Sequence, residues 1–207
     1  MELALDANAL KFGEYTLKSG RVSPYFFNAS AFSTGHQLQI LGRCYRDAIM
    51  DCGVDFDGLF GPAYKGIPLA SSVAVAFAEE GRDYPVSFNR KEAKDHGEGG
   101  IMLGAPLNGR VLAIDDVVTA GTAVRGSVDF IKNQGASLCA FCVAVDRQER
   151  GREGLGSALS ELSETFELVS ISIVTLDDIL AFASDDPRIA DDIAPRIEAY
   201  RAQYGAL

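Results

Sequence analysis

The sequence predicts an α/β fold with a mainly parallel central sheet covered by helices on both faces. Between residues 37 and 180, strand-like segments alternate with segments of helical periodicity, a pattern that calls for right-handed crossovers between parallel strands. Residues 111–114 form an apolar run that is too short for a helix and is typical of a strand buried on both faces. The chain has 207 residues, 47% of them hydrophobic, which suits one domain with a sizeable core. We therefore expect residues 1–207 to form a single domain.

The elements are predicted from apolar spacing and from turn and cap residues. Residues 12–27 are expected to form two short strands around a turn at 18–21, with the second strand at an edge because it contains Pro24. Further strands are predicted at 57–60, 84–89, 111–114, 137–145 and 168–174, and helices at 37–52, 67–80, 123–134 and 157–165, with two terminal helices starting near Thr175 or Asp177 and after Pro187. The residues left over, about 1–36 and parts of the C-terminal region, are expected to form a small hood above the strand ends.

The segment from residue 90 to residue 109 shows no usable periodicity. It carries glycines and basic residues at close intervals, which predicts a long mobile loop rather than a helix or strand. The glycines are Gly97, Gly99, Gly100 and Gly104, and the basic residues are Arg90, Lys91, Lys94 and His96. A loop of this length inside a compact domain is usually functional or disordered.

Charge and composition exclude several classes of protein. The formal charge of −10 argues against nucleic-acid binding, which uses a basic surface to engage phosphates. A small polyanionic substrate is compatible with this charge if basic residues are concentrated locally. No apolar run approaches the ~20 residues that span a bilayer, and the first residues lack the basic region of a signal peptide. We therefore expect a cytoplasmic protein with neither a nucleic-acid nor a membrane partner.

The four cysteines suggest no disulfide framework in a chain of this size. Cys139 and Cys142 form a C-x-x-C pattern inside a predicted strand, where residues three apart point to opposite faces. We interpret both as core residues rather than as a metal or redox pair.

The stretch from Arg110 to Ala123 combines a strand, an acidic pair, a tight turn and the start of a helix. In an open parallel sheet the carboxyl ends of the strands face the ligand crevice, and a helix N-terminus there offers unpaired N–H groups to an anion. A glycine in the turn lets the backbone approach a phosphate, and two threonines add hydroxyl donors. Asp115 and Asp116, expected where the strand leaves the sheet, suit sugar hydroxyls or a divalent cation. The stretch therefore predicts a site for a phosphorylated sugar.

A simple helix cap and turn is the plainer interpretation, because strand-to-helix connections with Asp, Thr and Gly are common. Two other phosphate-binding motifs do not fit. No Gly-Lys-Ser or Gly-Lys-Thr follows the turn, which excludes a P-loop, and the G-x-G-x-x-G fingerprint of dinucleotide-binding folds is missing from it. The choice depends on the other motifs of the chain.

Residues 115–123, with the sequence DDVVTAGTA, resemble the signature by which type I phosphoribosyltransferases bind 5-phosphoribosyl 1-diphosphate (PRPP). Further blocks match in order, namely residues 16–21, 23–28, 60–66, 88–100 and 146–151. With these blocks, most of the chain is similar to the bacterial orotate phosphoribosyltransferase family. The resemblance implies the type I phosphoribosyltransferase fold. It also implies transfer of ribose 5-phosphate from PRPP to N1 of orotate, giving orotidine 5′-phosphate and diphosphate in de novo UMP biosynthesis.

A cofactor, a partner and a set of site residues are implied by the same resemblance. The cofactor is Mg²⁺, held mainly through substrate and water, and the partner is a second copy of the chain in a homodimer with active sites shared across the interface. Catalytic roles are implied for Lys94, His96 and Asp116. PRPP contacts are implied for Lys18, Tyr64, Lys65, Arg90, Lys91, Lys94, His96, Asp115, Asp116, Val117, Val118, Thr119, Ala120, Gly121, Thr122 and Ala123. Orotate contacts are implied for Phe26, Phe27, Thr119 and Arg147.

The residue types suit this reaction on chemical grounds. Cleavage of an anomeric C–O bond gives an oxocarbenium-like centre and a diphosphate whose charge must be neutralised, which calls for cations near the leaving group. The planar guanidinium of Arg147 matches a carboxylate bidentately. Phe26 and Phe27 are neighbours on a strand and face opposite ways, so one of them is expected in the core. Direct ligation of the metal by Asp115 or Asp116 stays open.

Other interpretations of these residues remain. The basic segment could be a solvated loop, and Tyr64 and Lys65 could belong to a plain turn. A regulator that binds PRPP without turnover could use the same fold, although it would not need the basic segment. A transferase for purine bases is a nearer alternative, and Arg147 argues against it.

Overall fold

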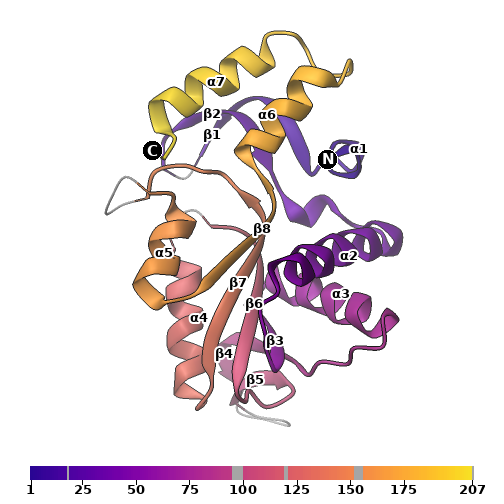
Figure 1. Cartoon of the computed structure of the whole chain (residues 1–207), viewed down its shortest axis with the longest axis vertical. Coiled ribbons are helices and arrows are strands. Elements are labelled where there is room, and N and C mark those ends of the chain that lie inside the picture. Colours follow the sequence, from indigo (N-terminus) through magenta and orange to yellow (C-terminus); the bar gives the residue numbers. More distant parts are fainter. Residues whose placement is uncertain (18, 95–99, 119–120, 152–155, 207) are drawn as a thin grey trace.

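The computed structural model describes residues 1–17, 19–94, 100–118, 121–151 and 156–206. Within them, a six-stranded sheet with the strand order β5-β4-β3-β6-β7-β8 forms the centre of the molecule (Figure 1). Neighbouring strands pair in parallel except for β4 and β5, which confirms the predicted mainly parallel sheet. The strands are β3 (Gly58–Gly61), β4 (Val86–Lys94), β5 (Gly100–Gly104), β6 (Arg110–Val117), β7 (Ser137–Asp146) and β8 (Val169–Thr175).

Helices cover both faces of this sheet, with α2 and α3 on one face and α4 and α5 on the other (Figure 1). β6 serves both layers, because Leu112 and Ile114 point into the core under α2 and α3, whereas Val111 and Ala113 point into the core under α4 and α5. The strand is therefore buried on both faces, as predicted, and each larger side chain contributes roughly 1.5–3 kcal/mol. The helices are α2 (Gly35–Cys52), α3 (Gly66–Glu79), α4 (Thr122–Asn133) and α5 (Ala158–Phe166).

Local sequence signals fix the ends of α2. Gln37 N donates to Thr34 Oγ1 at 3.2 Å and Thr34 N donates to Gln37 Oε1 at 3.1 Å, which makes a capping box. Gly53 ends the helix with φ of 69°, a conformation that glycine adopts without strain. The helix begins at Gly35 rather than at Gln37, and its predicted end is confirmed.

The long loop predicted for residues 90–109 is wrong for residues 90–94 and 100–104, which belong to strands. β4 runs on to Lys94, and β5 returns antiparallel to it, with Ser87 opposite Gly104. β5 is the edge strand, and all of its residues are exposed or half-exposed. Met102 packs against the core under α4 and α5, but no residue of β5 is fully buried, so apolar periodicity does not reveal this strand. Residues 95–99 lie outside the described residues.

The cysteine pattern in β7 also differs from its predicted geometry. Val111 pairs with Leu138, but the next pair is displaced by one residue, so Cys139 is the extra residue of a β-bulge. The bulge reverses the alternation of side chains, and Cys139 and Cys142 both pack against the core under α2 and α3. The prediction that they point to opposite faces was wrong for this reason. Both thiols are free, and Cys142 is fully buried.

β1 (Leu10–Thr16) and β2 (Val22–Phe27) form a separate antiparallel pair. Tyr200 packs against it with its ring edge-to-face to Tyr25, at 6.4 Å between centroids. In Figure 1 this pair, α6 and α7 lie beyond the carboxyl ends of the main strands, where the sequence predicts the hood. No helix in the described part of the chain is long and apolar enough to cross a membrane. The remaining elements are α1 (Glu2–Asp6), η1 (Ala29–Ala31), α6 (Leu176–Asp185) and α7 (Ile193–Tyr204).

Candidate active site

Three turns meet where β3, β6 and β7 end, a region that we call the carboxyl edge. β6 lies between β3 and β7, so the segments at 61–66 and 146–151, and the described residues 117, 118, 121 and 122, follow neighbouring strands. Parallel strands end on the same side of a sheet, and ligands of open α/β sheets bind there. Blocks that are far apart in the sequence are therefore brought together, as the fold prediction requires.

Asp115 and Asp116 lie within β6 rather than beyond it. Val117 still pairs with Val145 of β7, because backbone pairing continues past the last apolar side chain. Both aspartates are buried, with 9% and 4% of their surfaces exposed. Asp115 Oδ1 accepts a hydrogen bond from Asp116 N at 2.9 Å, and Tyr45 OH donates to the backbone oxygen of Asp115 at 2.8 Å. The acidic pair is thus built into the end of a central strand.

The two carboxylates differ in their surroundings. Lys65 Nζ lies 2.5 Å from Asp116 Oδ2, and the lysine side chain remains 47% exposed. Burial, and then the neighbouring charge of Asp116, raise the pKa of Asp115 to about 7. The carboxyl group of Asp115 therefore holds a proton more readily than a free aspartate does, whereas Asp116 has the ammonium group of Lys65 beside it.

The turn between β3 and α3 explains how Lys65 reaches β6. A Cβ on Gly66 would lie 2.7 Å from the carbonyl oxygen of Ile114, so glycine is required for this close approach. Because Gly66 packs against the backbone of β6, the preceding residue, Lys65, lies beside Asp116. The sequence did not predict this contact, because the resemblance assigns both residues to PRPP rather than to each other.

Tyr64 and Lys91 meet at the outer side of the same turn. Tyr64 follows Ala63 through a cis peptide bond and is 66% exposed. Lys91 Nζ lies 4.6 Å from the centroid of the Tyr64 ring, within the range of a cation–π interaction. Arg90, the preceding residue of β4, donates from Nη1 to the carbonyl oxygen of Gly100 at 3.1 Å. Arg90 therefore braces the hairpin, while Lys91 lies beside the turn.

The described residues on either side of the β6–α4 connection are Val117, Val118 and the segment that starts at Gly121. Gly121 has φ of 70° and precedes the first residue of α4, Thr122. Thr122 and Ala123 are exposed in the first turn of the helix. Val117 and Val118 pack into the two cores on opposite faces of the sheet, so a phosphate would meet them through their backbone.

Some predicted site residues lie outside the described residues, namely Lys18, His96, Thr119 and Ala120. Lys94 is the last residue of β4, with its backbone opposite Gly100. Its side chain also lies outside the described part of the structure.

Arg147 lies in the loop after β7 and is only 7% exposed. Its Nε and Nη2 atoms lie 2.7 and 2.6 Å from Oε1 of Glu149, and Nη2 donates to Ser23 Oγ at 3.3 Å. Its Cζ lies 4.5 Å from the centroid of the Tyr25 ring. The guanidinium that the sequence assigns to a substrate carboxylate is thus paired with a carboxylate of the protein.

The side chains of Phe26 and Phe27 point to opposite faces of β2, as the alternation of side chains along a strand predicts. Phe27 is 8% exposed and belongs to the main core. Phe26 is 38% exposed and stacks on Tyr15, with 5.5 Å between ring centroids. Only the ring of Phe26 is open to a ligand.

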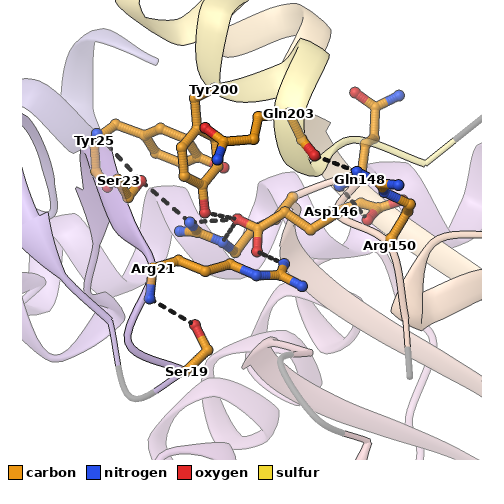
Figure 2. Close-up of polar contacts among 11 residues, drawn as sticks. Ser19, Arg21, Ser23, Tyr25, Asp146, Gln148, Arg150, Tyr200 and Gln203 are labelled. Carbon is orange, nitrogen blue, oxygen red and sulfur yellow. Dashed lines mark hydrogen bonds and ion pairs between the residues drawn. The ribbon is translucent and has the colours of Figure 1, made fainter.

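Sequence reasoning missed the residues that surround Arg147. Figure 2 shows Arg21, Ser23 and Tyr25 directed from the β1–β2 region, and Tyr200 directed from α7, toward a common centre. Arg21 Nη1 donates to Glu149 Oε2 at 3.0 Å across 128 positions of sequence. Several of these residues lie inside the matching blocks, but no local pattern indicates that they meet.

Residues 204–206 form backbone hydrogen bonds with the loop that carries Arg147. Arg150 N donates to the carbonyl oxygen of Tyr204 at 2.9 Å, and Ala206 N donates to that of Gln148 at 2.8 Å. An isolated antiparallel bridge joins the two segments between these bonds. The backbone of the loop that carries Arg147 is therefore held by residues from much later in the chain.

Comparisons with known proteins agree with this architecture. Residues 34–170 match the model of the phosphoribosyl transferase domain. Orotate phosphoribosyltransferases of Yersinia enterocolitica and Cronobacter sakazakii are each 56% identical over 206 residues, which cover 99% of this chain and 96% of each relative. The crystal structure of orotate phosphoribosyltransferase from Francisella tularensis superposes with a TM-score of 0.87 at 38% identity, covering 99% of this chain and 98% of that one. The chain belongs to the orotate phosphoribosyltransferase family, a branch of the proteins with the phosphoribosyl transferase domain.

Proposed function

We propose that the chain transfers ribose 5-phosphate from PRPP to orotate, giving orotidine 5′-phosphate and diphosphate in de novo UMP biosynthesis. The observation that carries this proposal is the 56% identity with curated orotate phosphoribosyltransferases over nearly the full chain. The chemistry of the carboxyl edge suits the reaction, because buried carboxylates, an exposed lysine and the start of a helix are neighbours there.

The ribose 5-phosphate lies, in this proposal, between the acidic pair and the start of α4. Backbone N–H groups of residues 117–123 bind the 5′-phosphate, and Asp115 and Asp116 accept hydrogen bonds from the ribose hydroxyls. Positive charge develops on the ribose as its bond to diphosphate breaks, and a buried carboxylate stabilises that charge. Asp116 is the better candidate for this role, since its carboxylate lies beside Lys65, the lysine assigned to the leaving diphosphate.

The leaving diphosphate lies beside Lys65. When PRPP binds, the ammonium group of Lys65 leaves the carboxylate of Asp116 and pairs with a diphosphate oxygen. The carboxylate of Asp116 can then accept hydrogen bonds from the ribose hydroxyls. The support for this exchange is the short ion pair and the exposure of the lysine. The other residues assigned to the diphosphate by family resemblance are Lys18, Tyr64, Arg90, Lys91, Lys94 and His96, with Lys94 and His96 as the catalytic groups.

Orotate is a planar anion whose ring is already acidic, so positioning and desolvation matter more than a strong base. The guanidinium of Arg147 takes the orotate carboxylate. The ring of Phe26 and the hydroxyl of Thr119 line the base, and buried Phe27 contributes through its backbone.

Mg²⁺ fits this site as a cofactor held mainly by PRPP and water. Mg²⁺ takes oxygen ligands, which the diphosphate, the ribose hydroxyls and water would supply, with Asp115 and Asp116 close by and Asp116 already paired with Lys65. When bound, the ion neutralises charge on the diphosphate. The chain's own residues orient the ribose and the base around it.

Absorbance of orotate provides a direct test. With PRPP and Mg²⁺ present, the purified chain should consume orotate and release diphosphate. Binding of PRPP without turnover of any base would support a regulator instead, and turnover of adenine or hypoxanthine alone would support a purine transferase. Either result would overturn the proposed activity.

We also propose a cytoplasmic homodimer whose sites are completed by the partner's 90–100 segment, on the basis of family resemblance. Lys94→Ala and Asp116→Asn proteins should each be nearly inactive, with Lys94→Ala lowering kcat far more than it weakens orotate binding. If the two residues act from different subunits, subunit exchange between them should restore about a quarter of wild-type activity. A monomer by size-exclusion chromatography, or no recovery after exchange, would contradict shared sites.

A further inference from the structure

Glu149 lies at the centre of a buried cluster that links Arg147 to the hood. Its Oε1 atom receives the two contacts from Arg147 and also a hydrogen bond from Tyr200 OH at 2.9 Å. Its Oε2 atom accepts from Arg21 Nη1 at 3.0 Å. The carboxylate side chain is 14% exposed, so water contributes little to its solvation. Residues from both ends of the chain, Arg21 and Tyr200, therefore donate to one acidic group.

The hydrogen bonds of Arg147 use one edge of its guanidinium. Nε and Nη2 lie beside Glu149, and Nη2 also donates to Ser23, while the Tyr25 ring covers one face. Within the described residues, no hydrogen bond is formed by Nη1. The guanidinium of Arg147 is thus held along its Nε–Nη2 edge, which leaves the N–H groups of Nη1 for a ligand.

The charges of the cluster favour a second carboxylate. Arg21 and Arg147 share the single carboxylate of Glu149, which leaves an excess positive charge. Asp146 lies next to Arg147 in the chain, but its side chain accepts from Gln148 N at 2.9 Å and forms no ion pair with either guanidinium within the described residues. An anionic ligand of one negative charge would balance the two guanidinium groups.

We propose that Glu149 is a positioning residue for the base site. It holds the guanidinium of Arg147 in the orientation that receives the orotate carboxylate. Because Arg21 and Tyr200 also bind Glu149, the position of this guanidinium depends on the packing of β2 and α7. The inference rests on the proposed function and deepens it. Glu149 does not touch the substrate; it acts by fixing the guanidinium that does.

Glu149→Gln keeps the shape of the side chain and removes its charge. The amide can still accept from Tyr200, but it no longer balances Arg147, and its NH₂ group opposes the guanidinium donors. Arg147 should lose its fixed orientation, so the KM for orotate should rise on the order of 10-fold or more. The KM for PRPP should change less than about twofold, because PRPP binds at other residues.

Steady-state kinetics with each substrate varied in turn measure the change in the KM for orotate and the change in the KM for PRPP separately. Tyr200→Phe removes one hydrogen bond to Glu149 and should raise the orotate KM by a smaller factor, again without changing the PRPP KM. Glu79→Gln is the matched control, since Glu79 pairs with Arg43 on the surface of α3 and should alter neither KM. Thermal unfolding checks that each variant is folded, and if Glu149→Gln fails to fold, Arg21→Gln and Tyr200→Phe carry the comparison.

Three results would overturn the role of Glu149. An unchanged orotate KM would show that Arg147 needs no support, and a lowered one would show that Glu149 competes with the substrate carboxylate. Equal rises in both KM values would indicate general damage to the site. Calorimetric titration of wild type with orotate separates these outcomes from failure of the proposed function, because absent orotate binding by the wild-type chain would remove the function itself.

Discussion

Asp116→Asn should lower kcat/KM for PRPP by about 100- to 1,000-fold, or roughly 2.7–4 kcal/mol. Asparagine has nearly the same shape, so the end of β6 keeps its packing. The variant lacks the negative charge that stabilises positive charge on the ribose, and it leaves Lys65 without the partner found at 2.5 Å. Because the charge on the ribose develops only in the transition state, kcat should carry most of the loss.

Asp129→Asn serves as the control for this substitution. Asp129 is exposed on α4. The substitution makes the same chemical change away from the carboxyl edge, so the kinetics of this variant should match those of the wild type. Both proteins should unfold at similar temperatures. A fall in kcat/KM of less than about threefold for Asp116→Asn would remove this carboxylate from the reaction, because a stabilising charge in a desolvated site contributes far more.

Arg147→Ala should raise the orotate KM by about 30- to 1,000-fold, the factor expected when a buried, hydrogen-bonded charge loses its partner. The substitution removes the only base-site cation among the residues assigned to orotate. It also leaves Glu149 with Arg21 and Tyr200, which still satisfy its oxygens, so the hood should stay folded. The KM for PRPP should stay close to the wild-type value.

The matched control for Arg147 is Arg43→Ala, which breaks an exposed ion pair with Glu79 on α2 and α3. Exposed pairs contribute only about 0–1 kcal/mol to stability, so neither KM should change. Kinetics with varied orotate, together with thermal unfolding of both variants, make the comparison. An orotate KM equal to that of wild type would exclude Arg147 from the base site.

The sequence predicted the layers of the fold and the elements around β6 because those features depend on local periodicity. Leu112 and Ile114 alternate with Val111 and Ala113 as a doubly buried strand must. β5 was missed because its exposed residues show no pattern. Cys139 was misassigned because a bulge depends on the register with β6, which the residues of β7 alone do not encode.

The candidate site could be predicted as a set of segments but not as a set of contacts. The matching blocks placed Lys65 and Asp116 near one ligand, yet their mutual ion pair joins positions 51 residues apart. The cluster around Glu149 includes one contact across the same separation and two across 124 and 128 positions. Such contacts follow from how β2 and α7 pack beyond the main sheet, which no local signal specifies.

The fastening of the loop 147–151 by residues 204–206 has a consequence for synthesis. Chains are made from the amino end, and early segments begin to fold while later ones are still absent. The central sheet can assemble at that stage, but the loop that carries Arg147 receives its backbone partners from Tyr204 and Ala206 only later. A nascent chain that has already buried β6 therefore still lacks the backbone partners of the loop that carries Arg147, and the base site proposed there is completed only once α7 has been made.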